Sequence, residues 1–206
     1  MIDFHNHIIP EVDDGSRSIE ESVLMLRHAF KTGIKEVVTT MHLNHPNIKN
    51  DHIIYDEVLY KKKQLENKLS QENINIKIHL GAEIYIGPNI ENYFNHDFAL
   101  IGNDRNKYML IEFPTILFPP NYEEILFNMK LKGITPIIAH PERYRLIKQD
   151  YLQIEKFIKI GCLIQIDAGS VLGLFGKDSE TCVKKLIKDG YVHLLGSDAH
   201  NSKKRN

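Results

Sequence analysis

A repeated local pattern, in which a helix ends at glycine and an apolar strand follows at once, constrains the fold of this 206-residue chain most strongly. The pattern occurs in four segments, KTGIKEVVTT, LKGITPIIAH, IKIGCLIQID and IKDGYVHLLGSD. Lysine shortly before glycine is typical of a helix C-terminus, because glycine adopts the left-handed conformation there and a cation suits the negative end of the helix dipole. Helices that alternate with strands in this way predict parallel strands joined by helical crossovers.

The complete pattern predicts seven strands with helices between them. The strands are centred near residues 2–5, 35–40, 76–80, 108–112, 135–139, 162–167 and 192–196. Helices are expected over residues 18–30, 51–72, 121–133, 150–160 and 179–190, and residues 88–106 are expected to be irregular or briefly helical. The first helix has Ser18 at its N-cap and Glu21 three residues later, which is the pattern of a capping box. Such units either close into a barrel of the (β/α)8 type with one unit missing or form an open, doubly wound sheet.

Composition narrows the class of protein. With 42% apolar and 26% charged residues, the chain is expected to form one folded α/β domain over residues 1–206. A formal net charge of −1 provides no basic field for nucleic acid. No signal peptide and no apolar run long enough to span a membrane is visible, so we expect a cytoplasmic protein. Cys162 and Cys182 are expected to be buried structural thiols.

Residues that commonly bind metals follow strand after strand in this chain. They are His5, His7, His42, Glu83, Glu112, His140, Asp198 and His200. The carboxyl ends of parallel strands meet on one side of the fold, so these side chains should converge, and convergence from six strands favours the barrel over the open sheet. In an extended segment, residues two positions apart share a face, which lets His5 and His7 bind one ion together, and likewise Asp198 and His200.

The number of these residues predicts more than one metal ion. One ion takes about four to six ligands, so two or three ions are expected, with a carboxylate such as Glu83 bridging between them. A set of histidines and carboxylates without thiolates suits Mn²⁺, Fe or Zn²⁺, and such a centre activates water and holds a phosphate. The remaining histidines are expected to be ordinary surface residues. These are His28, His45, His52, His79, His96 and His193.

Several motifs together resemble the polymerase and histidinol phosphatase (PHP) superfamily. They are the N-terminal HNH, TTMH, GAEIY, LIEFP, IIAHPERY and GSDAHN. Within the superfamily, the chain resembles the bacterial manganese-dependent tyrosine-protein phosphatases of capsular and exopolysaccharide operons. The resemblance covers essentially the whole chain and implies a distorted (β/α)7 barrel with three metal ions.

The resemblance also implies which residues bind each ion. The first ion would be bound by His5, His7, Glu83 and Asp198; the second by Glu83, Glu112 and His140; and the third by Asp14, His42 and His200. Spacing alone leaves the choice between Asp13 and Asp14 open, and the family resemblance selects Asp14. Asp3 and Asp13 are assigned no role beyond local hydrogen bonding.

A phosphomonoester is the substrate best matched to such a centre. Arg143, three residues after His140, is placed to reach the same rim, and its planar guanidinium suits a phosphate. Arg205 is a second, weaker candidate, and a surface cation is the alternative interpretation of both. A cysteine-dependent mechanism needs C-x5-R, but Ala168 and Lys188 stand six positions after the two cysteines.

The leading hypothesis is therefore a phosphatase that acts on phosphotyrosine of a bacterial tyrosine kinase. A histidinol-phosphate-type phosphatase, a PHP phosphodiesterase and a non-catalytic binding partner are the alternatives. Members of the resembling family usually continue beyond SDAHN with further helices, so either a truncated chain or a natural ending is expected, and an assembly of identical subunits stays open.

Overall fold

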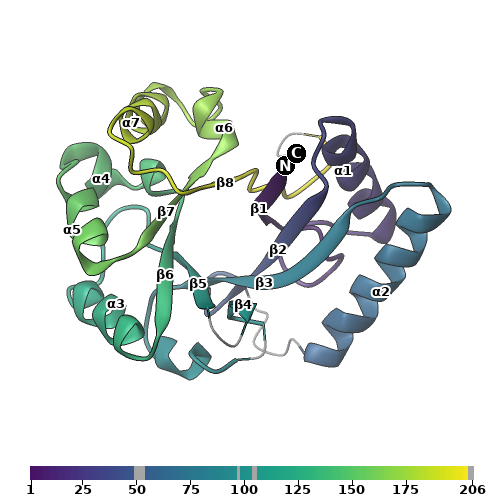
Figure 1. Cartoon of the computed structure of the whole chain (residues 1–206), viewed down its shortest axis with the longest axis horizontal. Coiled ribbons are helices and arrows are strands. Elements are labelled where there is room, and N and C mark those ends of the chain that lie inside the picture. Colours follow the sequence, from purple (N-terminus) through teal and green to yellow (C-terminus); the bar gives the residue numbers. More distant parts are fainter. Residues whose placement is uncertain (49–53, 97, 104–105, 204–206) are drawn as a thin grey trace. The chain divides into compact units, whose positions relative to one another are not determined.

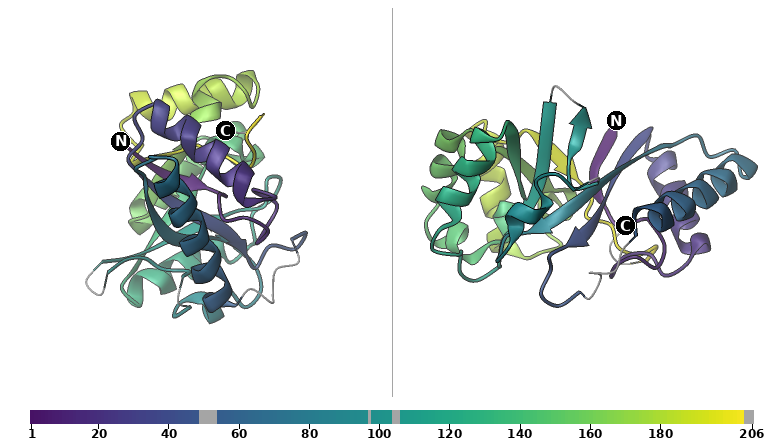
Figure 2. Two further views of the ribbon diagram at one scale, coloured as in Figure 1. Left: turned by 90° about the vertical axis from the view of Figure 1, so that its right-hand side faces the viewer. Right: turned by 90° about the horizontal axis from the view of Figure 1, so that it is seen from below.

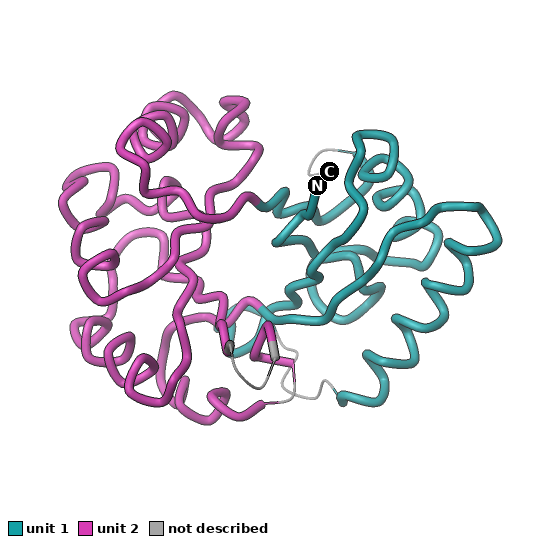
Figure 3. The backbone as a smooth tube through the Cα atoms, viewed as in Figure 1, with its two compact units in different colours: residues 1–82, 196–206 teal, residues 83–195 magenta. Residues whose placement is uncertain are grey.

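The computed structural model describes residues 1–48, 54–96, 98–103 and 106–203, and these form two compact units (Figure 3). Unit 1 comprises residues 1–82 and 196–206, and unit 2 comprises residues 83–195. None of the helices in the described parts of the chain is both long enough and apolar enough to cross a membrane.

Unit 1 is built on two parallel strands, β1 (Ile2–Asn6) and β2 (Glu36–Leu43), with β3 (Lys77–Tyr85) next in the sheet. Helices α1 (Ile19–Lys31) and α2 (Tyr55–Gln71) lie side by side against these strands (Figures 1 and 2). Apolar residues of both helices and of the strands pack together in one core. Among them are Val23, Leu26, Val37, Leu65 and Ile78.

The start of α1 confirms half of the expected capping box. The Glu21 amide donates a hydrogen bond to Ser18 Oγ at 3.2 Å, which caps the helix as predicted. The Glu21 carboxylate accepts instead from the amide of Arg17, one residue before the N-cap. Ser18 is therefore the N-cap, whereas the reciprocal bond of a capping box goes to the preceding residue.

Unit 2 contains parallel pairs between the last residues of β3 and β5, between β5 and β6, and between β6 and β7. Its strands are β4 (Ile101–Asn103), β5 (Asn106–Glu112), β6 (Ile134–Ala139), β7 (Leu163–Asp167) and the beginning of β8 (Leu194–Gly196). Its helices are η1 (Ile90–Tyr93), α3 (Tyr122–Leu131), η2 (Pro141–Arg143), α4 (Arg145–Gln149), α5 (Gln153–Ile160), α6 (Ala168–Val171) and α7 (Lys177–Lys188). Helices α3, α5 and α7 lie outside the strands of this unit (Figure 1).

The order of the strands confirms the expected α/β barrel type. Neighbours in the sheet follow the chain as β1-β2-β3-β5-β6-β7-β8, and β4 pairs with β5. In unit 1, Ala199, just after β8, forms a parallel bridge with Asn6, and the amide of His7 donates to the Ala199 carbonyl at 2.9 Å. The strand order therefore returns to its first member, as it does in a barrel and not in an open sheet.

All seven predicted strands are present, and four elements were not predicted. The four glycines of the repeated pattern have φ angles between 74° and 90°, which is the left-handed conformation that ends a helix. The missed elements are β4, η2, α4 and α6, each of five residues or fewer. Residues 88–106 do contain the expected brief helix, η1, but β4 forms there as well because it pairs antiparallel with β5.

Candidate metal centre

The N-terminal histidine pair meets Asp198 inside unit 1. His5 lies on β1 and His7 directly after it, and their Nε2 atoms are 3.2 Å apart. Each of these nitrogens lies 3.4 Å from Asp198 Oδ1, and all three residues are at most 2% exposed. The spacing of two along an extended segment therefore places both rings beside one carboxylate.

Asp13 fixes the orientation of the His7 ring. Its Oδ2 lies 2.8 Å from His7 Nδ1, and it also accepts hydrogen bonds from the amides of Gly15 and His42. Burial acts to raise the pKa of Asp13, but the charges and hydrogen bonds around it, above all those of His7, bring the pKa below its ordinary value. A carboxylate at this position accepts the Nδ1 proton, which leaves the Nε2 lone pair for a metal.

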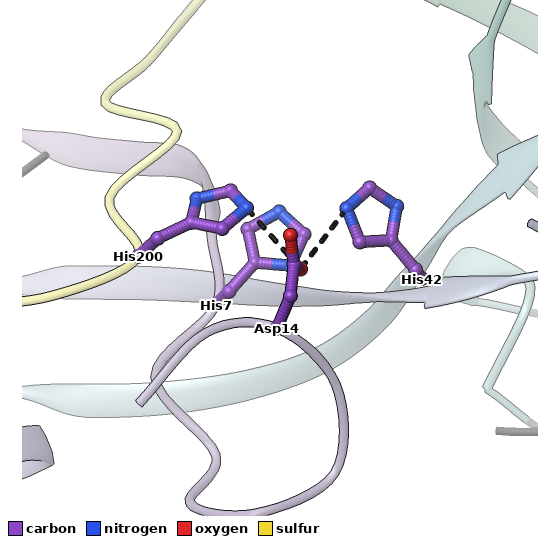
Figure 4. Close-up of side chains that lie close together, drawn as sticks. All are labelled: His7, Asp14, His42 and His200. Atoms are coloured by element: carbon purple, nitrogen blue, oxygen red, sulfur yellow. Dashed lines mark ion pairs between the residues drawn. The ribbon is translucent and has the colours of Figure 1, made fainter. Parts of the chain in front are cut away.

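A second group of ligand atoms surrounds Asp14 (Figure 4). Asp14 Oδ1 lies 3.5 Å from His42 Nε2 and 3.4 Å from His200 Nε2, and the two rings stand on either side of it. His7 lies with them, and one ligand atom from each of the four residues falls within 4.8 Å of the others. Burial acts to raise the pKa of Asp14, but the hydrogen bond and charge of His200, together with the charges of His42 and His7, hold it well below its usual range.

The Nδ1 atom of His200 lies 2.9 Å from the backbone carbonyl of Asp198. A carbonyl can only accept, so Nδ1 carries the proton and Nε2 is left as the ligand atom that faces Asp14. In both His7 and His200 the proton is therefore on Nδ1 and the lone pair is on Nε2. The acceptor is the Asp13 carboxylate for His7 and the Asp198 carbonyl for His200.

These residues fit a metal ion by their own geometry. Two imidazole nitrogens 3.2 Å apart, both directed at a buried carboxylate, form an arrangement that a divalent cation would satisfy. The ligand atoms are nitrogen and oxygen, which suits Mn²⁺, Fe or Zn²⁺. His7 contributes to both groups, so unit 1 offers two adjacent positions for metal.

Asp3 places the segment that carries Asp198. Its carboxylate accepts hydrogen bonds from the amide and hydroxyl of Ser197 at 2.9 and 2.7 Å, although the two residues are 194 positions apart in sequence. It also accepts from the amide of His5 at 3.3 Å. Burial raises the pKa of Asp3 despite these bonds. Asp198 itself has a left-handed backbone with φ of 49°, a strained conformation for a residue with a side chain.

Unit 2 contains three potential ligands at the ends of its strands. His140 Nε2 lies 2.9 Å from Glu83 Oε1, and oxygens of Glu83 and Glu112 fall within 4.8 Å of each other. Two carboxylates so close repel each other unless a proton or a cation lies between them. His140, like Asp198, has a positive φ, here 30°. This set is therefore also suited to a metal ion.

Tyr144 holds the strand ends that carry these ligands. Its hydroxyl donates to the carbonyl of Ala139 at 2.6 Å and accepts from the amide of Phe113 at 3.0 Å. These partners adjoin His140 and Glu112 in the sequence. Tyr144 is fully buried, and burial, helped by the charge of Glu112, raises the pKa of its hydroxyl far above the usual value, so that the hydroxyl stays a donor.

Replacing Tyr144 with phenylalanine should lower the free energy of unfolding by about 1–3 kcal/mol, because a buried amide and a buried carbonyl lose their partner. Chemical denaturation followed by circular dichroism measures this change. Tyr122→Phe is the matched control, because the Tyr122 hydroxyl makes a longer bond of 3.3 Å to Gln153. Equal losses in the two variants would contradict the role given to Tyr144.

Comparison with known proteins identifies the family. The sequence profile of the capsular polysaccharide synthesis family CpsB/CapC matches residues 1–206. The chain belongs to the CpsB/CapC family.

Relatives of this CpsB/CapC chain include tyrosine-protein phosphatases. YwqE of Bacillus subtilis (strain 168) is 36% identical over 100% of the chain and 80% of the relative. CpsB of Streptococcus pneumoniae is 30% identical over 98% of the chain and 83% of the relative. A crystal structure described as one of the metal-dependent tyrosine phosphatases YwqE and CpsB superposes with a TM-score of 0.90, covering 100% of this chain and 82% of the other.

The fold, but no more, is shared with histidinol phosphate phosphatase of Lactococcus lactis. That structure has a TM-score of 0.51 and 17% identity, and covers 100% of the CpsB/CapC chain and 98% of its own. Together these relatives confirm the predicted PHP-type fold.

All nine residues predicted as ligands lie in one of the two groups in unit 1 or in the set in unit 2. The exact assignment of ligands to three ions, and the sharing of Glu83 between two of them, stay predictions. Arg143 lies on η2 beside His140, and its role stays a prediction, whereas Arg205 lies outside the described residues. Asp3, Asp13 and Tyr144 are supporting residues that the sequence did not reveal. The expectation of only local hydrogen bonds for Asp3 and Asp13 is wrong, because Asp3 also accepts from Ser197 and Asp13 from the amide of His42. The doubled aspartate in DDG was the available signal for Asp13.

The histidines expected at the surface of the CpsB/CapC chain differ among themselves. His28 and His193 are exposed, as predicted, and His52 lies outside the described residues. His79 and His96 are half-buried, and His79 pairs with Glu36 at 2.7 Å. His45 is also half-buried, and its ring centre is 5.0 Å from that of His42.

Asp13→Asn should weaken metal binding by about 10- to 100-fold, because an amide at this position no longer holds the His7 tautomer as a carboxylate does. Titration of the metal-free CpsB/CapC protein with Zn²⁺ against a competing chelator measures the change. Asp56→Asn, at an exposed aspartate on α2, is the control and should leave affinity unchanged. Unaltered affinity in Asp13→Asn would show that Asp13 does not support the metal.

Proposed function

We propose that this protein is a Mn²⁺-dependent protein-tyrosine phosphatase. The observation that carries the proposal is the buried convergence of His5, His7 and Asp198 next to the group of Asp14, His42 and His200. The names of the relatives YwqE and CpsB support tyrosine-phosphate chemistry. Fe and Zn²⁺ have the same ligand preferences, so the choice of Mn²⁺ rests on the family resemblance.

The residues of this chain would divide the work between holding metal and holding substrate. Metal ions bound here would supply an activated water and neutralise the charge of the phosphate. The ligand nitrogens are aimed by Asp13 on His7 and by the Asp198 carbonyl on His200. Arg143 is proposed to bind the phosphate through its planar guanidinium, and tyrosine phenolate leaves without strong acid assistance.

A comparison of three substrates tests the proposal. The Mn²⁺-loaded protein should hydrolyse a phosphotyrosyl peptide faster than histidinol phosphate or single-stranded DNA, and His5→Ala should abolish the reaction. Faster turnover of either other substrate would assign the protein to the corresponding alternative class. Tight, stoichiometric binding of a tyrosine-phosphorylated kinase without release of phosphate would instead indicate a non-catalytic binding partner.

The natural substrate is proposed to be a bacterial tyrosine kinase that controls capsule or exopolysaccharide synthesis. The match to a capsular polysaccharide synthesis family supports this choice. We place the reaction in the cytoplasm, because Cys162 and Cys182 are free thiols and disulfides seldom form in that compartment. Incubation with a phosphorylated kinase tail, followed by phosphotyrosine immunoblotting, would test the partner.

Treatment with iodoacetamide at neutral pH should leave phosphatase activity unchanged. Both cysteines are buried, as predicted, and burial raises the pKa of Cys162 to about 12 and that of Cys182 to about 11. A thiol is nucleophilic only as thiolate, so neither group serves as the nucleophile at neutral pH. Activity before and after alkylation, with mass spectrometry of the native protein, measures this; rapid inactivation would support a cysteine mechanism instead.

A further inference from the structure

The Arg143 side chain is held on two sides by other residues of unit 2. Its Nη1 donates a hydrogen bond to Asp167 Oδ2 at 3.0 Å, and its guanidinium carbon lies 4.5 Å from the centre of the Phe175 ring. The Arg143 side chain is 20% exposed, whereas that of Asp167 is completely buried. An arginine used only as a surface cation needs neither contact.

Asp167 is itself fixed from both directions. Its amide donates to the buried carboxyl group of Glu142 at 2.9 Å, and its Oδ1 accepts from the amide of Gly169 at 2.7 Å. One carboxylate oxygen of Asp167 therefore caps α6, while the other accepts the hydrogen bond from the Arg143 guanidinium. This position at the end of β7 lets a rigid element of the sheet determine where the arginine points.

The Phe175 ring is placed by close contact with Gly169. A Cβ atom on Gly169 would lie 2.7 Å from Phe175 Cε2, closer than two carbon atoms approach. The ring therefore lies directly on the backbone of α6, and the Arg143 guanidinium lies over its face. A cation over an aromatic face is attracted to it, so the ring restricts the tilt of the arginine as Asp167 restricts its rotation.

We propose that Asp167 and Phe175 are positioning residues that hold the Arg143 guanidinium in one orientation for the phosphate of the substrate. The inference rests on the proposed phosphatase function. Holding an arginine fixed before the substrate arrives removes the cost of ordering its long side chain during binding. The buried Asp167 carboxylate also offsets the positive charge of Arg143 near the phosphate. A contact that lowers this charge does not strengthen the attraction of the phosphate, so we assign the contact to orienting the arginine.

Two substitutions separate orientation from charge. Asp167→Asn keeps an oxygen for the Gly169 amide but replaces the oxygen that receives Arg143 with an amide nitrogen. Phe175→Leu keeps an apolar side chain without an aromatic face, and Phe175→Tyr restores that face. Leu174→Ala, at a 68% exposed residue of the same loop, is the control.

For a phosphotyrosyl peptide, kcat/KM should fall about tenfold in Asp167→Asn and in Phe175→Leu. In Phe175→Tyr and in Leu174→Ala it should stay within about twofold of the parent value. Inorganic phosphate, titrated calorimetrically into the Zn²⁺-loaded protein, should bind more weakly in the same two variants. Stronger phosphate binding in Asp167→Asn would overturn the proposal, because it would mean that the carboxylate only masks the charge of Arg143. Equal loss in Phe175→Leu and Phe175→Tyr would also overturn it.

A readout independent of activity uses the Arg143 side chain directly. In NMR spectra of the metal-free protein, the Nε–Hε signal that disappears in Arg143→Lys identifies this residue. The signal should keep its position in Phe175→Tyr and should move or broaden in Asp167→Asn and Phe175→Leu; an unchanged signal in these two would contradict the proposal. If the parent protein fails to hydrolyse phosphotyrosine while the NMR differences appear, the proposed function is wrong and the positioning of Arg143 is correct.

Discussion

Replacing His7 with alanine is expected to reduce phosphatase activity by more than about a hundredfold and to lower the metal content of the purified protein. His7 contributes a ligand atom both to the group with His5 and Asp198 and to the group with Asp14, so one substitution affects two metal positions. Elemental analysis gives the number of ions per chain, and initial rates with a phosphotyrosyl peptide give the activity.

The control for this experiment is His28→Ala, which removes an exposed histidine from α1. It should keep the parent's metal content and rate. Normal metal content and activity in His7→Ala would refute the metal centre that we describe. A loss of activity with full metal content would instead restrict His7 to a role in catalysis.

Removal of metal by a chelator is expected to abolish activity and to lower the melting temperature. Ligand binding to the folded state alone stabilises it by about 2.7 kcal/mol at roughly 100 times Kd, and the clustered carboxylates of Glu83 and Glu112 repel each other once the cation is gone. Activity after dialysis against EDTA, and after readdition of Mn²⁺, Fe²⁺ or Zn²⁺, measures the dependence.

Readdition of each metal also ranks the candidates for the native ion. Mn²⁺ is expected to restore the highest rate. Higher activity with Zn²⁺ or Fe²⁺ would change the assignment of the metal while leaving the centre intact. Full activity in the chelated protein, with no metal detected by elemental analysis, would exclude a metal-dependent mechanism.

Four strands of this fold, β2, β6, β7 and β8, could be predicted from the sequence because each follows a helix-ending glycine within a few residues. Their lengths could not be predicted as well. β2 continues to Leu43 and β3 to Tyr85, beyond the apolar runs, because pairing with neighbouring strands extends them over His42 and Glu83. Elements as short as β4 leave little local signal, since its formation depends on the antiparallel partner β5.

The candidate site could be predicted where local spacing decides the geometry, as in the pair His5 and His7. The supporting residues could not be found in this way, because their contacts join distant parts of the chain. Asp3 bonds to Ser197, and Asp167 bonds to Arg143, across sequence separations that no local pattern records. Asp13 is close in sequence to its partner, but spacing does not distinguish a ligand from a residue that orients one.

The lack of a side chain at Gly15 keeps both ligand groups of unit 1 in place, and this limits how such a centre can change over evolution. A Cβ atom at this position would overlap the backbone oxygen and Cβ of His7, and the amide of Gly15 donates to Asp13. A single methyl group here would displace the loop that carries Asp13 and Asp14 from the histidine that both metal positions share. Natural variation at residue 15 is therefore expected to be confined to chains that have lost the metal centre, even though glycine itself binds nothing.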